Sequence, residues 1–275
     1  LYAISSDMKG RAAIWVQAIY WDMIMNAYKR TKAPKYRRLI EEVYQGGYEQ
    51  YDKYNWDNKI EWFIYDDMMW WIISLARAYE ITDDPKYLAH ASSGFYHVWK
   101  ESYDKERGGL WWNFKHDGKM ACINYPTTVG AMTLYNVTKD PDYLEKAKSV
   151  YAWSRDVFFD KEKGRIADNM HYHFQRQNGM DIDWTTQLYN QATFIGSAVM
   201  LLICWLVTLA LPLARELQVR AAGRERPLGV GRRRADPGGR ERHRHVRAQP
   251  QPRAHRRRAR RLRAEPRDRD RPDRG

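Results

Sequence analysis

The sequence of 275 residues lacks the patterns that mark several classes of protein. It has two cysteines, Cys122 and Cys204, without C-x-x-C spacing, and so predicts neither a disulfide framework nor a zinc site. His171 and His173 lie close together, but no third ligand follows at a fixed spacing, so we expect no metal. Walker and G-x-G-x-x-G phosphate-binding patterns are absent, and we expect no cofactor.

Two further absences divide the chain. The last lysine is Lys163 and the last aromatic residue is Trp205. From Arg215 onward there are 22 Arg and 8 acidic residues, a net charge of +14, whereas residues 1–214 carry −1. The basic character therefore comes from a tail without core-forming aromatics, and we expect residues 215–275 to be disordered.

Residues 202–275 allow three interpretations. We favour an out-of-frame reading of a GC-rich gene, because Arg, Ala, Pro and Gly dominate. The second is a membrane anchor with a basic flank, since residues 194–214 are uncharged and long enough to span a bilayer. The third is a nucleic-acid-binding tail, although such tails often interleave aromatics for stacking. We expect no specific nucleic-acid partner, and we do not favour a membrane partner.

We accordingly divide the chain into a globular domain, residues 1–201, an apolar segment, residues 202–214, and the Arg-rich tail, residues 215–275. No signal peptide is visible, but the sequence starts at Leu1 and not at Met, so this says nothing about its compartment.

The globular part contains a repeat that encodes helical hairpins. A Tyr, a Thr, a Pro and a second Tyr recur with identical spacing at Tyr28-Thr31-Pro34-Tyr36, Tyr79-Thr82-Pro85-Tyr87 and Tyr135-Thr138-Pro141-Tyr143. Proline is favoured at the first position of a helix, and the repeat length holds two helices and a turn. We expect helices at about 12–30, 34–50, 66–80, 85–100, 126–137, 141–157 and from 187 onward. No strand-like alternation of any length appears, so the fold class is all-α.

Gly- and Asn-rich loops fall between these turns, at residues 46–58, 108–113 and 164–183. They lie at the opposite end of each hairpin from the short Thr–Pro turn. Because binding residues usually sit on long loops held by a rigid scaffold, we expect function at this end.

Asp66 and Asp67 stand at the head of an expected helix, at the long-loop end. Asp66 could simply cap the helix while Asp67 interacts with its dipole. Alternatively, the two carboxyls could supply the acid and the nucleophile that glycosidic hydrolysis requires. Tyr65, Trp70 and the nearby Trp111-Trp112 favour the second possibility, because sugar clefts use flat aromatic faces.

Five short motifs occur in a fixed order along the globular part. They are Trp15-Val16-Gln17-Ala18, Tyr65-Asp66-Asp67-Met68-Met69-Trp70-Trp71, Gly108-Gly109-Leu110-Trp111-Trp112, Lys119 with Asn124, and Tyr189-Asn190-Gln191. In this order they resemble glycoside hydrolase family 76, the endo-α-1,6-mannanases, over about residues 10–201. The resemblance implies an (α/α)6 barrel, a retaining mechanism, an α-mannan substrate, and secretion or display at the cell surface or in the periplasm.

The resemblance also implies roles for residues. Asp66 would be the nucleophile and Asp67 the general acid/base. The expected substrate-binding residues are the aromatic and amide side chains of these motifs: Gln17, Tyr65, Trp70, Trp111, Trp112, Asn124, Tyr189, Asn190 and Gln191.

The sequence departs from the family pattern in ways that bear on activity. Val16 stands where Trp is common, and Ala192 follows Tyr189-Asn190-Gln191 where Gly is usual. A six-hairpin barrel needs twelve helices, and about seven are expected here. We therefore expect this chain to have weak or no activity. We also expect it to be a monomer. The alternatives are a non-catalytic glycan-binding or membrane-anchored helical protein, or another (α/α)6 sugar enzyme such as an epimerase.

Overall fold

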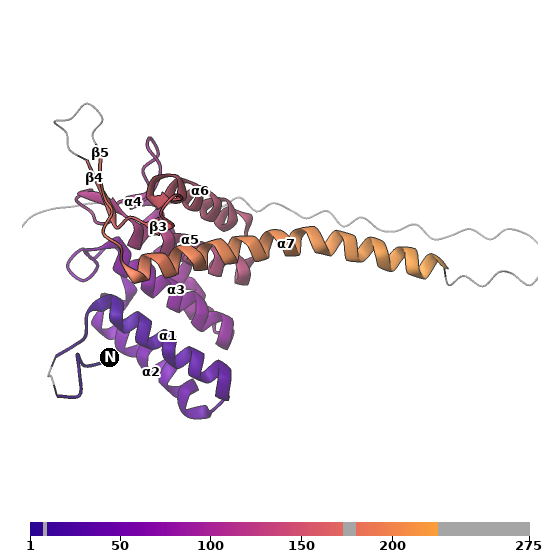
Figure 1. The fold of residues 1–275 in the computed structure, drawn as a ribbon. Helices are drawn as coiled ribbons and strands as arrows, with labels where there is room; N and C mark the ends of the chain where they lie inside the picture. The colour runs from indigo at the N-terminus through magenta and orange to yellow at the C-terminus, as the bar shows by residue number, and fades with distance from the viewer. Residues whose placement is uncertain (8–9, 173–179, 225–275) are drawn as a thin grey trace, which may run out of the picture. The chain divides into compact units, whose positions relative to one another are not determined.

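The computed structural model describes residues 1–7, 10–172 and 180–224, and this part of the chain contains seven α-helices (Figure 1). They are α1 (Ile14–Thr31), α2 (Pro34–Gln50), α3 (Tyr65–Thr82), α4 (Pro85–Ser102), α5 (Ala121–Thr138), α6 (Pro141–Phe158) and α7 (Leu188–Arg224). Every expected helix is present, and the all-α class is confirmed. We expected disorder over residues 215–275, but residues 215–224 continue the helix α7. Residues 225–275 lie outside the described residues.

The three Thr–Pro turns are built alike, which explains the repeat. α1, α3 and α5 each end in a left-handed residue, Lys32, Asp83 or Lys139, with φ of 54°, 55° and 59°. The N–H of that residue donates to the carbonyl oxygen of the repeated Tyr, four residues earlier. The repeated Thr donates its hydroxyl to the last turn of its own helix, at 2.7–2.8 Å. These bonds satisfy carbonyl groups that a helix end would otherwise leave unpaired.

The helix α5 begins at Ala121, five residues before the expected start, and Pro126 lies inside it. A proline there removes the N–H that would pair with the carbonyl of Cys122. Asn124 stabilises the first turn by donating its Nδ2 to the Met120 carbonyl at 2.8 Å. Ala121, Ile123 and Pro126 are buried, so packing offsets the lost bond.

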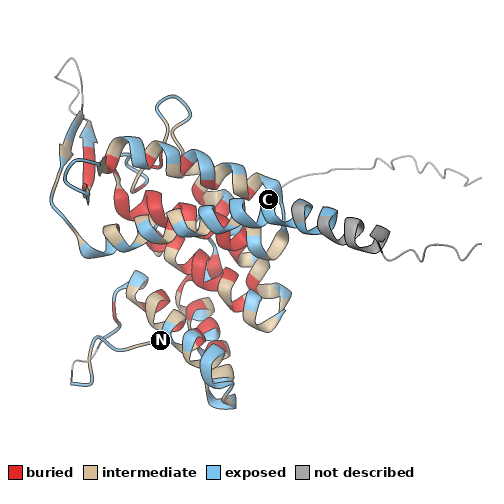
Figure 2. Ribbon diagram, turned by 45° about the vertical axis from the view of Figure 1, so that its right-hand side comes forward, coloured by how far each residue is buried: buried red, intermediate tan, exposed pale blue. Residues whose placement is uncertain are grey.

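The helices form an inner and an outer row. α1, α3, α5 and α7 pack successively on one another, whereas α2, α4 and α6 each pack on the helix that precedes them. Most residues of α3 and α5 are buried, so these two helices form the middle of the inner row (Figure 2). α1 and α7 lie at its edges and expose apolar side chains: Trp15, Met23, Ile195 and Val199.

Five short strands, which we did not predict, lie at the long-loop end. β1 (Gly118–Met120), β4 (Asn169–Tyr172) and β5 (Met180–Asp183) form an antiparallel sheet, and β2 (Phe159–Asp160) pairs with β3 (Arg165–Ile166). With two to four residues each, they are too short to show an alternating pattern.

The last helix, α7, is continuous through the apolar segment 202–214. Its first half packs on α5, where the Ser197 hydroxyl donates to the Tyr125 carbonyl at 3.1 Å. Beyond Cys204 the large apolar side chains that the structure describes are exposed, among them Trp205, Leu206 and Leu209. Within the described residues, Leu188–Glu216 is long and apolar enough to cross a membrane, a composition that core helices share.

Candidate active site

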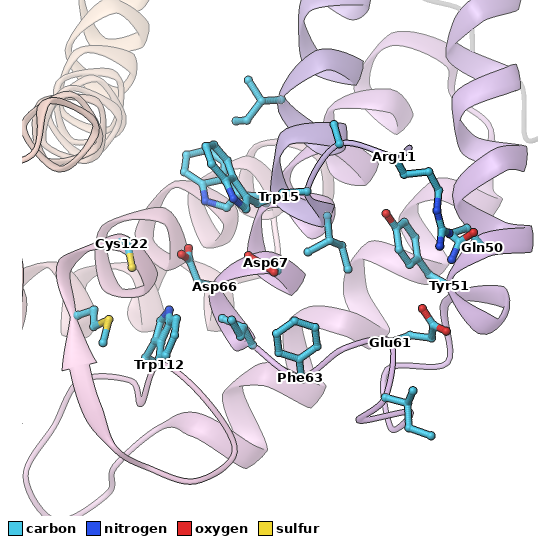
Figure 3. A pocket seen from close by; sticks show the side chains of 18 of the residues that line it. Arg11, Trp15, Gln50, Tyr51, Glu61, Phe63, Asp66, Asp67, Trp112 and Cys122 are labelled. Carbon is cyan, nitrogen blue, oxygen red and sulfur yellow. The ribbon is translucent and has the colours of Figure 1, made fainter. Parts of the chain in front are cut away.

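A cavity of about 960 Å³ opens at the long-loop end, beside the start of α3 (Figure 3). Four parts of the chain contribute its wall. The polar, aromatic and sulfur-containing side chains among them are Arg11, Trp15, Gln50, Tyr51, Glu61, Phe63, Asp66, Asp67, Trp70, Trp112, Met120, Cys122 and Tyr189. Five of the predicted site residues are therefore brought together: Asp66, Asp67, Trp70, Trp112 and Tyr189.

The start of α3 is fixed by the backbone and not by a side-chain cap. Its N-cap residue is Ile64, and no side chain caps the helix, so the interpretation of Asp66 as a cap is wrong. Instead the Tyr65 N–H donates to the Trp112 carbonyl at 3.0 Å, and Ile64 pairs with Asn113. This attachment places Trp112 beside the aspartate pair.

The aspartate pair lies where ionisation is costly. Burial raises the pKa of Asp66 to about 8, and repulsion from Asp67 adds to this, while hydrogen bonds with Cys122 and Trp70 act in the opposite direction. Burial also raises the pKa of Asp67, to about 7, and its side chain is only 7% exposed. At neutral pH the pair therefore retains about one proton, and it can serve as one acid and one carboxylate.

One oxygen of the pair has no partner within the protein. In the described part of the chain, Oδ1 of Asp66 is buried and accepts no hydrogen bond. Because an unsatisfied buried oxygen costs about 1–3 kcal/mol, such an atom is typical of a site that a ligand completes.

Aromatic side chains with exposed faces surround the pair. Trp15, Phe63 and Tyr189 are 47%, 48% and 47% exposed, although all three line the cavity. Tyr and Trp combine a flat apolar face with a polar group, which suits the C–H face and the hydroxyls of a sugar ring.

Two of the remaining predicted residues are buried amides that lie outside the cavity wall and hydrogen-bond to backbone segments next to it. Gln17 accepts a hydrogen bond from the Tyr2 N–H and donates to the Tyr2 carbonyl, both at 2.7 Å. Asn124 accepts from the Leu110 N–H at 2.8 Å and donates to the Leu110 carbonyl at 3.1 Å. These bonds hold the N-terminal segment and the segment that carries Trp112.

The other predicted residues also lie outside the cavity wall. Tyr65 is buried, and the Trp111 ring stacks on His116 with centroids 5.1 Å apart. Gln191 exchanges two hydrogen bonds with the backbone of Ile166, both at 3.2 Å. Asn190 is buried and donates to Asp168 at 3.0 Å. Their roles in substrate binding stay predictions.

Several residues of this site were not predicted from the sequence. Cys122 was considered only for disulfide or zinc chemistry, yet its thiol faces Asp66. Asp168 accepts hydrogen bonds from Asn190 and from the Tyr189 hydroxyl, the latter at 3.5 Å. Of these residues, Phe63 could have been predicted from the sequence, because it is an aromatic residue two positions before Tyr65 and its motif.

No metal site accompanies this arrangement in the part of the chain that the structure describes. No three His, Cys, Asp or Glu residues gather there in a group that could hold an ion. His173 lies outside the described residues.

Comparisons with known proteins agree with the geometry. The model of the family "Glycosyl hydrolase family 76" matches residues 3–203. The GH76A α-1,6-mannanase of Salegentibacter sp. HEL1_6 is 29% identical, with a TM-score of 0.64 over 71% of this chain and 56% of that enzyme. The structure of an inactive variant of that enzyme, in which two consecutive aspartates are replaced by Asn, is solved with α-1,6-mannotriose. This variant is 28% identical to the present chain, with a TM-score of 0.62 over 69% of this chain and 54% of the variant.

A third solved structure shares the fold alone. A D-mannose isomerase is 18% identical, with a TM-score of 0.57 over 74% of this chain and 61% of that one. A search of curated proteins gives no match. Relative to the Salegentibacter mannanase described above, the chain spans little more than half the length of that enzyme.

Proposed function

Because the chain belongs to glycosyl hydrolase family 76, we propose that its cleft binds α-1,6-linked mannan and that Asp66 and Asp67 hydrolyse the glycosidic bond. The observation that carries this proposal is the pair of adjacent, buried carboxyls with raised pKa values in an aromatic cavity. Support comes from the Salegentibacter mannanase, whose inactive variant lacks two consecutive aspartates.

The proposed mechanism has two steps and retains the anomeric configuration. In the first, the Asp66 carboxylate attacks the anomeric carbon while the Asp67 carboxyl donates its proton to the leaving oxygen. A covalent glycosyl-enzyme results, and the shortened chain leaves. In the second, Asp67 takes a proton from water, the water oxygen attacks the same carbon, and Asp66 is released as the carboxylate.

The proton must be redistributed for this reaction. In the free protein burial raises the pKa of both aspartates, so the two carboxyls share a proton that the mechanism needs on Asp67. Positive charge develops at the anomeric carbon in the transition state. We propose that this charge, next to Asp66, favours its ionised form and leaves the proton on Asp67.

We propose that turnover by this chain is low. The inner row has open edges at α1 and α7. Among the described residues, the cavity wall comes from α1, α2, α3, α5, α7 and the adjoining loops. Electrostatic stabilisation of a transition state needs a site from which water is excluded. An incompletely enclosed cleft would leave part of the bound sugar chain in water and weaken its interactions with the protein.

The other expectations extend this proposal. We propose that the catalytic domain ends near residue 201, since Leu201 and Cys204 are the last of the side chains described in α7 that pack on the core. We further propose that the domain is monomeric and acts outside the cell or at its surface. An epimerase that relies on a histidine base fits less well, because no His is found among the described residues that line the cavity.

The proposal is tested by product release from α-1,6-mannan. The wild-type chain should release reducing sugar slowly, with retained anomeric configuration by ¹H NMR. Asp66→Asn and Asp67→Asn should each lower the rate by at least 100-fold, on the order of the contribution of a positioned acid or base. Binding of mannan by all three proteins, with no product from any of them, would instead identify a glycan-binding protein.

A further inference from the structure

The second half of α7 leaves the helical core at the end opposite to the cleft. The aspartate pair lies in the first turn of α3, and the 18 residues of that helix extend over about 27 Å to the end with the Thr–Pro turns. α7 passes the end of α5 near Lys139 and continues beyond it (Figure 1). A surface that α7 forms there is therefore remote from the cleft.

Residues 205–214 of α7 are apolar and do not pack on the core. The described side chains of Trp205, Leu206 and Leu209 are 58%, 49% and 53% exposed. Thr208 is the one polar residue in this stretch, and its hydroxyl donates to the Cys204 carbonyl of the same helix at 2.8 Å. Because a polar group must find its partner within the protein in order to enter lipid, this stretch is compatible with an apolar lipid environment.

These ten residues are too few to cross a bilayer. At the rise of an α-helix they span about 15 Å, whereas the hydrocarbon core of a bilayer is about 30 Å thick. Residues 188–204 would supply the missing length, but the core holds them. Ser197 is fully buried and bonded to the Tyr125 carbonyl, and the Phe194 ring stacks on Phe159 with centroids 4.9 Å apart. The apolar stretch therefore fits within one leaflet.

A groove of about 570 Å³ lies between α7 and the end of α5. Apolar side chains of α7 contribute to its wall: Met200, Ile203, Val207 and Leu211. Lys139, from the turn after α5, and Arg215, which follows the apolar stretch of α7, also line it. Two elements thus place cations beside one apolar groove.

Both cations can bind an anionic group. In the described part of the chain no ion pair involves either of them, and Lys139 lies over the Tyr135 ring at 5.5–6 Å, with its nitrogen 5.7 Å from the centroid. The adjacent acids interact within the protein, Asp140 by accepting from the Asp142 N–H at 3.0 Å. From Arg215 onward the sequence carries a net charge of +14. An apolar helical stretch followed by positive charge is typical of segments that bind anionic membrane surfaces.

We propose that residues 205–214 lie in the plane of one leaflet of an anionic phospholipid bilayer, with Lys139 and Arg215 at the headgroup phosphates. The helix does not enter end-on, because the arginines that follow it would then be placed in the hydrocarbon. This differs from the sequence-based expectation, which favoured no membrane partner. The cleft, at the opposite end of the inner row, stays open to solvent. Membrane binding of this kind does not depend on the proposed hydrolysis of mannan.

Flotation of the full 275-residue chain with lipid vesicles tests this association. Vesicles with equal amounts of phosphatidylcholine and phosphatidylglycerol should bind the chain at least about 10-fold more tightly than vesicles of phosphatidylcholine alone. Leu206→Gln/Leu209→Gln should lower the affinity for the mixed vesicles by at least about 10-fold, because two apolar side chains no longer enter the lipid. Lys139→Gln should lower it by about 5-fold, the contribution of one cation near an anionic surface.

Matched controls come from the cleft end of the molecule. Leu188 is 84% exposed at the start of α7, and Lys163 is exposed between β2 and β3. Leu188→Gln and Lys163→Gln should leave vesicle binding unchanged. Trypsin added to the outside of vesicles that carry the bound chain should cleave at the arginines after residue 215 without protection, because an in-plane helix keeps them on the side from which the chain bound.

Several results would overturn the inference. Unchanged binding by Leu206→Gln/Leu209→Gln would assign the binding to the charged residues after the apolar stretch, and protection of those residues from trypsin would show a crossing helix. Equal binding to both kinds of vesicle would exclude the role of Lys139 and Arg215. Absence of binding to the mixed vesicles would exclude the membrane; a dimer in analytical ultracentrifugation that Leu206→Gln/Leu209→Gln abolishes would then assign this surface to a second copy of the chain.

Discussion

The aspartate pair should make the protein less stable as the pH rises. An unfolded Asp has a pKa of about 3.9, whereas the folded pKa values are raised to about 8 for Asp66 and about 7 for Asp67. Between these limits the folded state binds more protons than the unfolded state. The free energy of unfolding should therefore fall from about pH 4 to pH 8 and level off above it.

The magnitude follows from the size of the shifts. One pKa unit corresponds to 1.36 kcal/mol, so the shift of about three units at Asp67 amounts to about 4 kcal/mol. The shift at Asp66 is not counted separately, because part of it comes from repulsion by the neighbouring Asp67. Asp67→Asn removes one ionisable group and keeps its shape. We expect this variant to exceed the wild type in free energy of unfolding by about 2–4 kcal/mol at pH 8.

Urea unfolding at pH 4, 6 and 8 measures this difference. At pH 4 both carboxyls are protonated in the folded state, so wild type and Asp67→Asn should agree within about 0.5 kcal/mol. Asp83→Asn is the control, because Asp83 is exposed at the other end of the same helix. A stability difference that is the same at pH 4 and pH 8, or an Asn variant less stable at pH 8, would contradict a raised pKa of Asp67 in the folded protein.

Three further predictions concern the residues around the pair. Cys122→Ala removes a hydrogen-bond donor from Asp66, so the pKa of Asp66, followed by ¹³C NMR of the carboxyl, should be higher than in Cys122→Ser; a lower value in the Ala variant would contradict the contact. Asn124→Ala leaves the Leu110 N–H and carbonyl unpaired and should destabilise the fold by about 2–4 kcal/mol in urea unfolding, whereas Asn136→Ala, on an exposed face of the same helix, should cost less than about 1 kcal/mol. Gly109→Ala should cost about 3 kcal/mol or more in the same assay, because Gly109 has φ +72° and an added Cβ would lie 2.3 Å from the Trp153 ring; a cost below 1 kcal/mol would show that this segment is loosely packed.

The helices could be predicted because their signals are local. The Tyr, Thr and Pro of each turn act within five residues of one another, through a left-handed cap and a hydroxyl bond to the preceding turn. The early start of α5 could not be predicted from the sequence, because it depends on a hydrogen bond from Asn124 and on burial against other helices.

Residues of the site could be predicted from the sequence only where they belong to a recognisable motif. Asp66, Asp67, Trp70 and Trp112 come from two motifs that the structure joins through one backbone bond from Tyr65. Arg11, Glu61 and Cys122 come from segments that meet only in three dimensions, and no spacing in the sequence shows that they share a cavity. Conversely, the buried Gln17 and Asn124 belong to motifs yet contact backbone and not the cavity.

We propose that the aspartate pair cleaves an α-1,6-mannan chain. This cleavage is tested most directly by incubating α-1,6-mannotetraose with an equimolar amount of the wild-type chain and of Asp66→Asn/Asp67→Asn, and following the products by mass spectrometry. We expect slow formation of shorter mannosides by the wild type alone, although both proteins bind the tetraose. Equal product formation by the double variant, or binding without any product from the wild type, would contradict it.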